Sequence, residues 1–368
     1  MLELEKIITP TLLLDESKTR QHIHTMVEKA QKSSIRLRPH FKTHQSAAIG
    51  EWFREAGVNC ITCSSLQMAA YFASHGWNDI LVAFPVNIRE IALINQLAAT
   101  IHLGLLVESA YSVQFLDTNL KSSVDIWIKI DSGARRTGIT VTNASLVADI
   151  CQIIQRSSFM HLRGILTHAG QTYHSASPSH VVTSYQASVD LMTQLRDKLE
   201  MQGIHNLEIS VGDTPGCVLA NDLGKVDEIR PGNFVFFDAM QAYIGSCTAD
   251  DISVAVACPI VAIHPEFEKV IIYGGAIHLS SESFLLGDQK VYGLPTLLTA
   301  EGWSNPIPGG YVRSLSQEHG IVHVHYEACN SLNPGDLLGI IPVHSCITVS
   351  CLKKYLTLEG EILETMNC

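Results

Sequence analysis

The strongest constraint on the fold is a repeat of short apolar segments, each followed by a stretch with helical periodicity. Most of these segments start about 20 to 25 residues apart, which is the length of a strand plus a crossover helix. Eight alternating units of this kind favour a (β/α)8 barrel of the TIM type over an open doubly wound sheet. The eight predicted strands occupy residues 35–44, 59–65, 79–86, 101–109, 124–133, 161–170, 207–214 and 228–238.

The pattern changes near residue 246 and predicts a second domain. Strand-like segments then follow one another without amphipathic helices between them, at 254–263, 269–277, 320–328, 336–350 and 355–363. A chain of 368 residues is long enough for two domains. We therefore expect a barrel over residues 14–245. The mainly-β domain is expected over residues 246–368, together with the N-terminal residues 1–13.

Charge and hydropathy exclude several classes of partner. The formal net charge is −11, and no run of lysine or arginine is present, so nucleic acids and anionic membranes are not expected partners. No apolar stretch approaches the ~18 residues that span a bilayer. The N-terminus carries acidic residues and lacks an apolar signal core, which predicts a soluble cytoplasmic protein. Cys60 and Cys63 form a CxxC on a predicted strand, where they would point to opposite faces and bind no common metal.

In a TIM barrel, chemistry belongs at the carboxyl ends of the strands. Lys42 stands at such an end, within the sequence RPHFKTH. Desolvation and the nearby cations Arg36, Arg38 and His40 would favour its unprotonated amine, which suits formation of a Schiff base. The alternative is a surface lysine whose stem lies along apolar neighbours. Other polar residues that finish predicted strands are Asp131, His168 and Thr214.

Two glycine-rich turns follow the seventh and eighth predicted strands. They are SVGDTPGC at 210–217 and RPGN at 230–233. Barrels often bind phosphate at this place through backbone N–H groups and a helix N-terminus, and Thr214 would add a hydroxyl donor. Glycine and proline also serve tight turns without any ligand, and this alternative remains.

The third candidate element is the segment PVHSCITVS near the C-terminus. His344 and Cys346 lie two residues apart on a predicted strand, where they would share one face. An imidazole and a thiolate suit Zn2+ better than Mg2+ or Ca2+. Two protein ligands would leave open positions for water or substrate, whereas the alternative is a core histidine beside a core cysteine.

Taken together, these motifs resemble the family of D-threonine aldolase and D-serine dehydratase, whose barrel is related to that of alanine racemase. The resemblance spans nearly the whole chain. It rests on the ordered set RPHFKTH, IDSGARRTG, THAGQTY, SVGDTPG, RPGN and HSC. It implies a fold-type III pyridoxal 5'-phosphate enzyme with an N-terminal barrel and a C-terminal β domain. It also implies a homodimer in which each active site is completed by the partner subunit.

The resemblance assigns roles by position. Lys42 matches the Schiff-base lysine and the base at Cα, and His168 is the second expected catalytic residue. Arg136 matches the arginine near the ring oxygen of the cofactor, and Tyr173 a tyrosine of the cofactor pocket. Positions that bind the cofactor phosphate correspond to Thr214, Gly232 and Asn233. The metal pair corresponds to His344 and Cys346. Aldolase members tend to carry Asp at the second position, so the cysteine resembles the zinc-dependent dehydratases; Mn2+ is the second expected metal.

Two positions depart from the family pattern and leave open a substrate other than serine. Leu166 stands where dehydratases carry a pocket tyrosine, and His278 where many members carry lysine. The predicted reaction is metal-assisted β-elimination of water from a D-3-hydroxy amino acid, giving a 2-oxo acid and ammonia. The alternatives are retro-aldol cleavage as in D-threonine aldolase, amino-acid racemisation, and non-catalytic cofactor binding.

Overall fold

A computed structural model describes residues 2–175 and 177–366 of the chain. The chain separates into two compact units. One, called the barrel unit below, consists of His24–Lys42 and Gly50–Gly232. The other, called the β unit, contains Thr43–Ile49 and the described residues before 24 and after 232.

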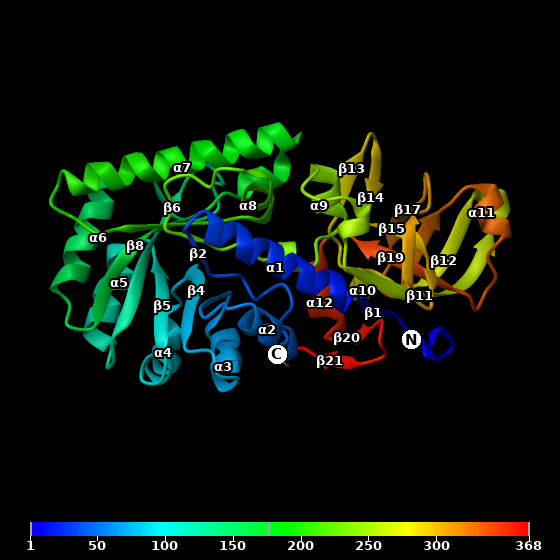
Figure 1. The fold of residues 1–368 in the computed structure, drawn as a ribbon, viewed down its shortest axis with the longest axis horizontal. Coiled ribbons are helices and arrows are strands. Elements are labelled where there is room, and N and C mark those ends of the chain that lie inside the picture. Colours follow the sequence, from blue (N-terminus) through cyan, green and yellow to red (C-terminus); the bar gives the residue numbers. More distant parts are fainter. Residues whose placement is uncertain (1, 176, 367–368) are drawn as a thin grey trace. The chain divides into compact units, whose positions relative to one another are not determined.

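The barrel unit is built on parallel strands in the order β2-β10-β9-β8-β6-β5-β4-β3. A parallel bridge between His40 and Thr62 joins β3 back to the segment after β2, and this bridge closes the sheet. The predicted (β/α)8 barrel is thereby confirmed (Figure 1). The strands are β2 (Arg36–Leu37), β3 (Ile61–Cys63), β4 (Asp79–Pro85), β5 (His102–Val107), β6 (Val124–Asp131), β8 (Met160–His168), β9 (Glu208–Gly212) and β10 (Glu228–Ile229), with the short β7 (Ile139–Thr140) beside β6.

Several helices of the chain begin at a residue whose side chain caps the first turn. Asp15 accepts a hydrogen bond from the N–H of Lys18 and caps the first helix. Asn143 caps α6 by accepting from the N–H of Leu146. The helices are α1 (Glu16–Lys32), α2 (Ala47–Glu55), α3 (Leu66–Ser74), α4 (Ile91–Ala98), α5 (Ala110–Asn119), α6 (Ala144–Arg156), α7 (Pro178–Glu200) and α8 (Thr214–Leu219).

Neighbouring strands of the barrel contribute a buried apolar cluster of Leu81, Leu106, Trp127 and Leu166. Side chains in layers fill the inside of such barrels, which explains the nearly continuous apolar runs seen in the sequence. On β8, Leu166 lies two residues before His168 and shares its face of the sheet. The barrel therefore presents an apolar floor below its carboxyl-terminal rim.

The β unit contains a ten-stranded sheet and a separate hairpin. The main path runs in the order β16-β15-β19-β11-β1-β20-β21, while β12 joins β11 to β18 and β17 pairs with β18. The strands are β1 (Thr11–Leu14), β11 (Val254–His264), β12 (Lys269–Tyr273), β15 (Gly293–Thr299), β16 (Gly302–Pro306), β17 (Tyr311–Leu315), β18 (His319–His323), β19 (Leu337–Pro342), β20 (Lys354–Thr357) and β21 (Ile362–Glu364), and the hairpin is β13 (Phe284–Leu286) with β14 (Gln289–Val291).

The prediction that no helices interrupt these strands is wrong. Short helices follow β12, β18 and β19. They lie at the ends of segments that the sequence assigned entirely to strands, because a run of four to eight apolar residues carries no helical period long enough to be recognised. A further helix of this unit, α9, precedes the first of its long strands. The four helices are α9 (Ala239–Ile244), α10 (Ala276–Leu279), α11 (Tyr326–Asn330) and α12 (Ser345–Leu352).

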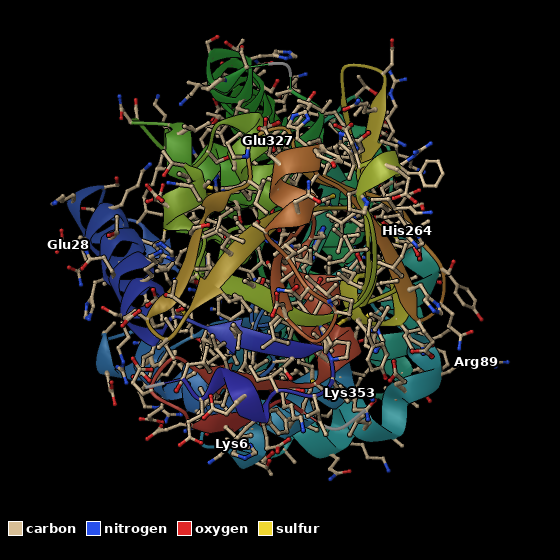
Figure 2. The ribbon with its side chains drawn as sticks, turned by 90° about the vertical axis from the view of Figure 1, so that its right-hand side faces the viewer. Lys6, Glu28, Arg89, His264, Glu327 and Lys353 are labelled. Atoms are coloured by element: carbon tan, nitrogen blue, oxygen red, sulfur yellow. The ribbon has the colours of Figure 1, made fainter. Side chains whose placement is uncertain are left out.

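Charged side chains such as Lys6, Glu28 and Arg89 are exposed and project from the ribbon (Figure 2). Among the described residues, no helix has the length and hydropathy that a bilayer span requires. Cys60 and Cys63 are both buried and free, and burial raises the pKa of each thiol.

A buried carboxylate, Glu228, joins three strands of the barrel. Its Oε2 accepts hydrogen bonds from Arg36 Nε and Arg38 Nε, both at 2.7 Å, and its Oε1 accepts from Ser210 Oγ at 2.7 Å. Burial by itself would raise the pKa of Glu228, but the two guanidinium groups lower it from 4.5 to about 2. The carboxylate is therefore charged in the folded protein at all ordinary pH values.

Glu228→Gln should destabilise the fold by about 3 to 5 kcal/mol, because it removes the buried carboxylate that both guanidinium groups share. It leaves Arg36 with Glu208 alone and Arg38 with Asp79 alone. Since the pKa of Glu228 is depressed in the folded state, its contribution is complete above pH 4.5 and is lost as the pH falls towards 2. Urea unfolding at pH 7 and below pH 4 measures both effects. Glu28→Gln, which removes an exposed carboxylate of α1, should change the stability by less than about 1 kcal/mol. Equal effects of the two variants would contradict this account.

Candidate active site

Lys42 follows the first barrel strand, two residues after the bridge at His40. The packing of the preceding residue, Phe41, fixes its backbone. Phe41 is fully buried, and its ring lies 4.9 to 5.1 Å from the rings of Phe53, Phe72 and Trp77. This aromatic cluster fixes the backbone from which the lysine projects. Lys42 itself is exposed, so the desolvation that the sequence analysis expected is absent in the structure.

The two arginines that were expected to act on Lys42 are engaged elsewhere. Arg36 and Arg38 both bind Glu228, and Arg38 also pairs with Asp79 at 2.6 Å. Their charges are compensated by these carboxylates.

His168 ends β8 and has a defined tautomer. Its Nδ1 lies 2.5 Å from the carbonyl oxygen of Gly212, and because a carbonyl can only accept, Nδ1 carries the hydrogen and Nε2 does not. Burial, followed by the charges of Lys42, Lys129 and Arg136, lowers the pKa of His168 to about 3. The imidazole is neutral, and the charges of Lys42 and Arg136, two further predicted residues, contribute to lowering its pKa.

The predicted phosphate turn forms the start of α8. Thr214 is the first residue of this helix, and its backbone N–H donates to the hydroxyl of Tyr173 at 3.2 Å. Asp213 caps the helix and accepts hydrogen bonds from Gly216 N at 2.5 Å and Thr172 Oγ1 at 3.0 Å. The buried Oγ1 of Thr214 has no hydrogen-bond partner among the described residues. A hydroxyl without a partner at a helix N-terminus is suited to an anionic oxygen.

The second glycine-rich turn divides between the two units. Gly232 belongs to the barrel unit and follows Pro231, whose carbonyl accepts from the N–H of His40 at 2.9 Å. Asn233 belongs to the β unit, where its Nδ2 donates to Asp238 Oδ2 at 2.7 Å and Ser345 Oγ at 2.9 Å. The amide hydrogens of Asn233 are thus used within the β unit, and phosphate binding by this residue stays a prediction.

His344 and Cys346 lie at the start of a helix, so their predicted position on a strand is wrong. The strand β19 ends at Pro342, and α12 begins at Ser345 with His344 as its extended N-cap residue. The β-branched residues after Cys346 led the sequence analysis to extend the strand. His344 and Cys346 therefore do not share the face of a strand. Both lie at the N-terminus of the same helix.

Polar groups of the β unit surround the thiol of Cys346. The Sγ atom lies 3.2 Å from Thr43 Oγ1 and 3.8 Å from Asn233 Nδ2, and the residue is 7% exposed. Asp238 accepts from the N–H of Ser345 at 3.0 Å and so fixes the first turn of the helix. Burial raises the pKa of Asp238, while the charge of His344 opposes the shift. Imidazole and thiolate are ligands that zinc sites use. Polar groups around such ligands orient them and tune the site.

Two buried basic residues of the barrel, Lys129 and Arg230, were not predicted from the sequence. Lys129 on β6 donates to the carbonyl of Ile130 at 3.1 Å, and burial, with Arg230 and Arg136 nearby, lowers its pKa to about 7. Arg230 donates to Ser210 Oγ at 2.7 Å and to the carbonyl of Thr167 at 2.5 Å, and burial lowers its pKa to about 10. The sequence did indicate Lys129, because a lysine within the largely apolar segment VDIWIKID would be buried, and buried lysines are rare without a partner.

The two departures from the family pattern have different surroundings. Leu166 belongs to the apolar floor below His168. His278 lies on α10, where its Nδ1 accepts from the N–H of Gly275 at 3.2 Å and its Nε2 lies 4.0 Å from Glu318. Burial lowers the pKa of His278. The contacts with Gly275 and Glu318, both in the β unit, position the side chain of His278.

Comparison with known proteins supports the same family over the whole chain. Residues 14–240 match the family described as "Alanine racemase, N-terminal domain", and residues 253–358 match a "Putative serine dehydratase domain". D-threo-3-hydroxyaspartate dehydratase of Delftia sp. (strain HT23) is 27% identical over 96% of this chain and 94% of its own. D-serine dehydratase of Dictyostelium discoideum is 28% identical over 98% of this chain and 95% of its own.

A solved structure of the Delftia dehydratase superposes with a TM-score of 0.91 at 27% identity, covering 99% of each chain. A mutant of that enzyme in a metal-free form gives a TM-score of 0.92 at 26% identity, covering all of each chain. The resemblance read from the motifs is thereby confirmed. The chain belongs to the family with an alanine racemase N-terminal domain, in the branch that contains the D-serine dehydratases and D-threonine aldolases.

Proposed function

We propose that this protein is a pyridoxal 5'-phosphate-dependent lyase that removes water from a D-3-hydroxy amino acid and forms a 2-oxo acid and ammonia. The observation that carries the proposal is the position of His168, bound to the carbonyl of Gly212 at the end of β9, next to the turn where the buried hydroxyl of Thr214 has no partner among the described residues. The full-length similarity to two dehydratases of D-3-hydroxy amino acids supports this choice of reaction.

The residues present fit the cofactor. Lys42 offers the amine to which it would be attached, and Arg136 a cation near its ring. For the phosphate, Thr214 offers a buried hydroxyl without a partner, next to the hydroxyl of Tyr173. Gly232 and Asn233 complete the proposed phosphate contacts. When bound, the cofactor supplies an electron sink for the negative charge left at Cα after a proton is removed.

The chain's own residues account for the proton movements. The exposed amine of Lys42 would take the proton from Cα. The C–O bond at Cβ would then break, and the proton held by Lys42 would pass to the departing hydroxyl, which leaves as water. The released enamine takes up water and gives the 2-oxo acid and ammonia. His168 cannot act as a cationic acid near pH 7, because its pKa is about 3. We assign it the role of accepting a hydrogen bond at Nε2 and so orienting the substrate.

We infer that His344 and Cys346 bind Zn2+, with Mn2+ as the second candidate. A metal there would act as a Lewis acid towards the β-hydroxyl. Two supports come from the chain: Thr43, which contacts Cys346, directly follows Lys42, and Asp238 fixes the turn that carries both ligands. The metal-free form described for a related dehydratase also supports a metal. The homodimer with shared active sites, and a cytoplasmic location, remain predictions.

The reaction is tested by incubating the purified protein with a panel of D-amino acids and their L-enantiomers. D-serine and D-threo-3-hydroxyaspartate belong in the panel because the relatives are named for them. We expect equal amounts of 2-oxo acid and ammonia from a D-3-hydroxy amino acid and none from the L-form. Glycine together with an aldehyde would instead show aldol cleavage, and loss of optical activity alone would show racemisation.

Thr214→Val should weaken binding of the cofactor by about one to two decades, since a hydrogen bond to a charged group contributes about 1.5 to 3 kcal/mol. The buried hydroxyl of Thr214 has no other partner among the described residues, so its removal costs no internal hydrogen bond. Equilibrium dialysis against pyridoxal phosphate measures the effect. Thr183→Val, on the exposed face of α7, is the control. Unchanged affinity in Thr214→Val would place the phosphate elsewhere.

A further inference from the structure

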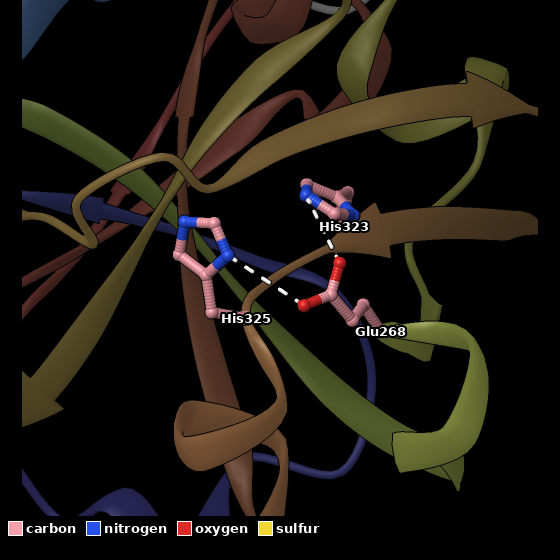
Figure 3. Close-up of side chains that lie close together, drawn as sticks. All are labelled: Glu268, His323 and His325. Carbon is pink, nitrogen blue, oxygen red and sulfur yellow. Dashed lines mark ion pairs between the residues drawn. The ribbon is translucent and has the colours of Figure 1, made fainter.

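The β unit carries a group of metal-binding side chains that the proposed reaction does not use. Glu268 precedes β12, His323 ends β18, and His325 lies directly before α11. Figure 3 shows the carboxylate between the two imidazoles. None of these residues belongs to the HSC segment, and all three come from the β unit.

The sheet register alone would not bring the three side chains together. In the antiparallel pair β12–β18, Lys269 lies opposite His323, so Glu268 lies opposite Val324, whose N–H donates to its carbonyl at 3.3 Å. An extended residue at that position would share the face of Val324, which is fully buried. Glu268 instead has a left-handed backbone, with φ 49° and ψ 46°. This conformation costs about 1 to 2 kcal/mol for a residue with a side chain and accompanies a carboxylate turned to the histidines.

The spacing of the ligand atoms suits one metal ion. Glu268 Oε2 lies 3.9 Å from His323 Nε2, and Glu268 Oε1 lies 3.6 Å from His325 Nδ1. One ligand atom from each residue lies within 4.8 Å of the others. Bonds of ~2.0 to 2.1 Å in a tetrahedral zinc site place ligand atoms roughly 3.4 Å apart. Small side-chain rotations would therefore complete the geometry.

Neighbouring residues orient both imidazoles. A Cβ atom at Gly309 would lie 2.5 Å from His325 Nε2, so the glycine leaves room for this edge of the ring while Nδ1 faces Glu268. The ring of His323 packs against that of Tyr311, with centroids 5.0 Å apart. The side-chain exposed fractions of 23%, 43% and 62% for His323, Glu268 and His325 leave the ligand atoms reachable from solution.

We propose that Glu268, His323 and His325 bind one divalent transition-metal ion, separate from the His344–Cys346 pair. Two imidazoles and one carboxylate form a donor set that Zn2+ takes readily. A bound ion would cross-link the turn before β12 to the end of β18 and the segment that follows it. Its fourth position stays open to water or to a group from another molecule.

Zinc titration of the full chain, followed by calorimetry in metal-free buffer, counts the sites. We expect two Zn2+ per chain for the unaltered protein and one for His325→Gln or Glu268→Gln. Loss of an outer partner of a metal ligand already costs about 10 to 100-fold in affinity, so loss of a ligand should cost at least about 100-fold. The matched controls are His319→Gln, on β18 with His323, and Glu266→Gln, two residues from Glu268; both should keep two sites.

Cys346→Ala separates this site from the proposed catalytic metal. In that variant one Zn2+ should remain, and Co2+ bound there should lack a thiolate-to-metal charge-transfer band. If the His344–Cys346 pair binds no metal, the unaltered protein should bind one Zn2+ and His325→Gln none. Equal binding by His325→Gln, Glu268→Gln and the unaltered protein would overturn the proposal. So would an equal loss in the two controls, with circular dichroism verifying that every variant is folded.

Discussion

Replacing Lys42 by alanine should give a folded protein that holds no covalently attached cofactor. Because the side chain is exposed and the fold here depends on Phe41, the substitution should leave the thermal stability nearly unchanged. The loss of proton transfer alone should lower the rate of 2-oxo acid formation by about 10²- to 10⁴-fold. Borohydride treatment followed by peptide mapping and a rate measurement checks both expectations.

Two further variants separate the chemistry of Lys42 from its charge. Lys42→Arg keeps a cation near His168 but offers no amine for attachment or proton transfer, so it should be as inactive as Lys42→Ala. Lys121→Ala removes an exposed lysine elsewhere in the barrel unit and should be fully active. A reduced cofactor found on another lysine, or an active Lys42→Ala variant, would contradict the assignment.

Cys346→Ala should abolish elimination while the protein still binds the cofactor. If a metal at this position contributes about 4 kcal/mol to the leaving of the hydroxyl, its loss lowers the rate by about 10³-fold. The variant should lose one equivalent of zinc by elemental analysis. His344→Ala should behave in the same way, because each residue supplies one of two protein ligands.

Cys351→Ala is the matched control for this prediction. Cys351 lies on the same helix, α12, five residues after Cys346. It should keep the metal and the activity. Cys346→Asp should still bind a metal but favour a harder ion such as Mn2+. A Cys346→Ala variant with undiminished activity would show that the thiol has no part in the reaction.

The barrel could be predicted from the sequence because its signal is repeated eight times. Several strands, such as that around Trp127, are largely apolar and buried, and the spacing of the runs leaves only a crossover helix between them. The order of the motifs then places Lys42, His168 and Thr214 at the carboxyl ends of strands. Errors in the exact ends of single elements do not change this arrangement.

The chemistry around these residues was harder to predict. The segment after Pro342 reads as a strand because Ile347, Thr348 and Val349 favour strands, but the carboxylate of Asp238, a hundred residues earlier, binds the N–H of Ser345 where a helix begins. Similarly, the pairing of Arg38 with Glu228 depends on strand neighbours far apart in sequence. Contacts of this range leave no local pattern in the sequence.

If Lys42 and the His344–Cys346 pair act on the same D-3-hydroxy amino acid, removal of the metal should stop the reaction without unfolding the protein. The protein is treated with a chelator, and its 2-oxo acid formation, circular dichroism and visible absorbance are recorded before and after Zn2+ is restored. We predict that activity falls by about 10³-fold and returns with Zn2+, while the fold and the cofactor absorbance persist throughout. Full activity of the metal-free protein, or loss of the fold with the metal, would contradict the account.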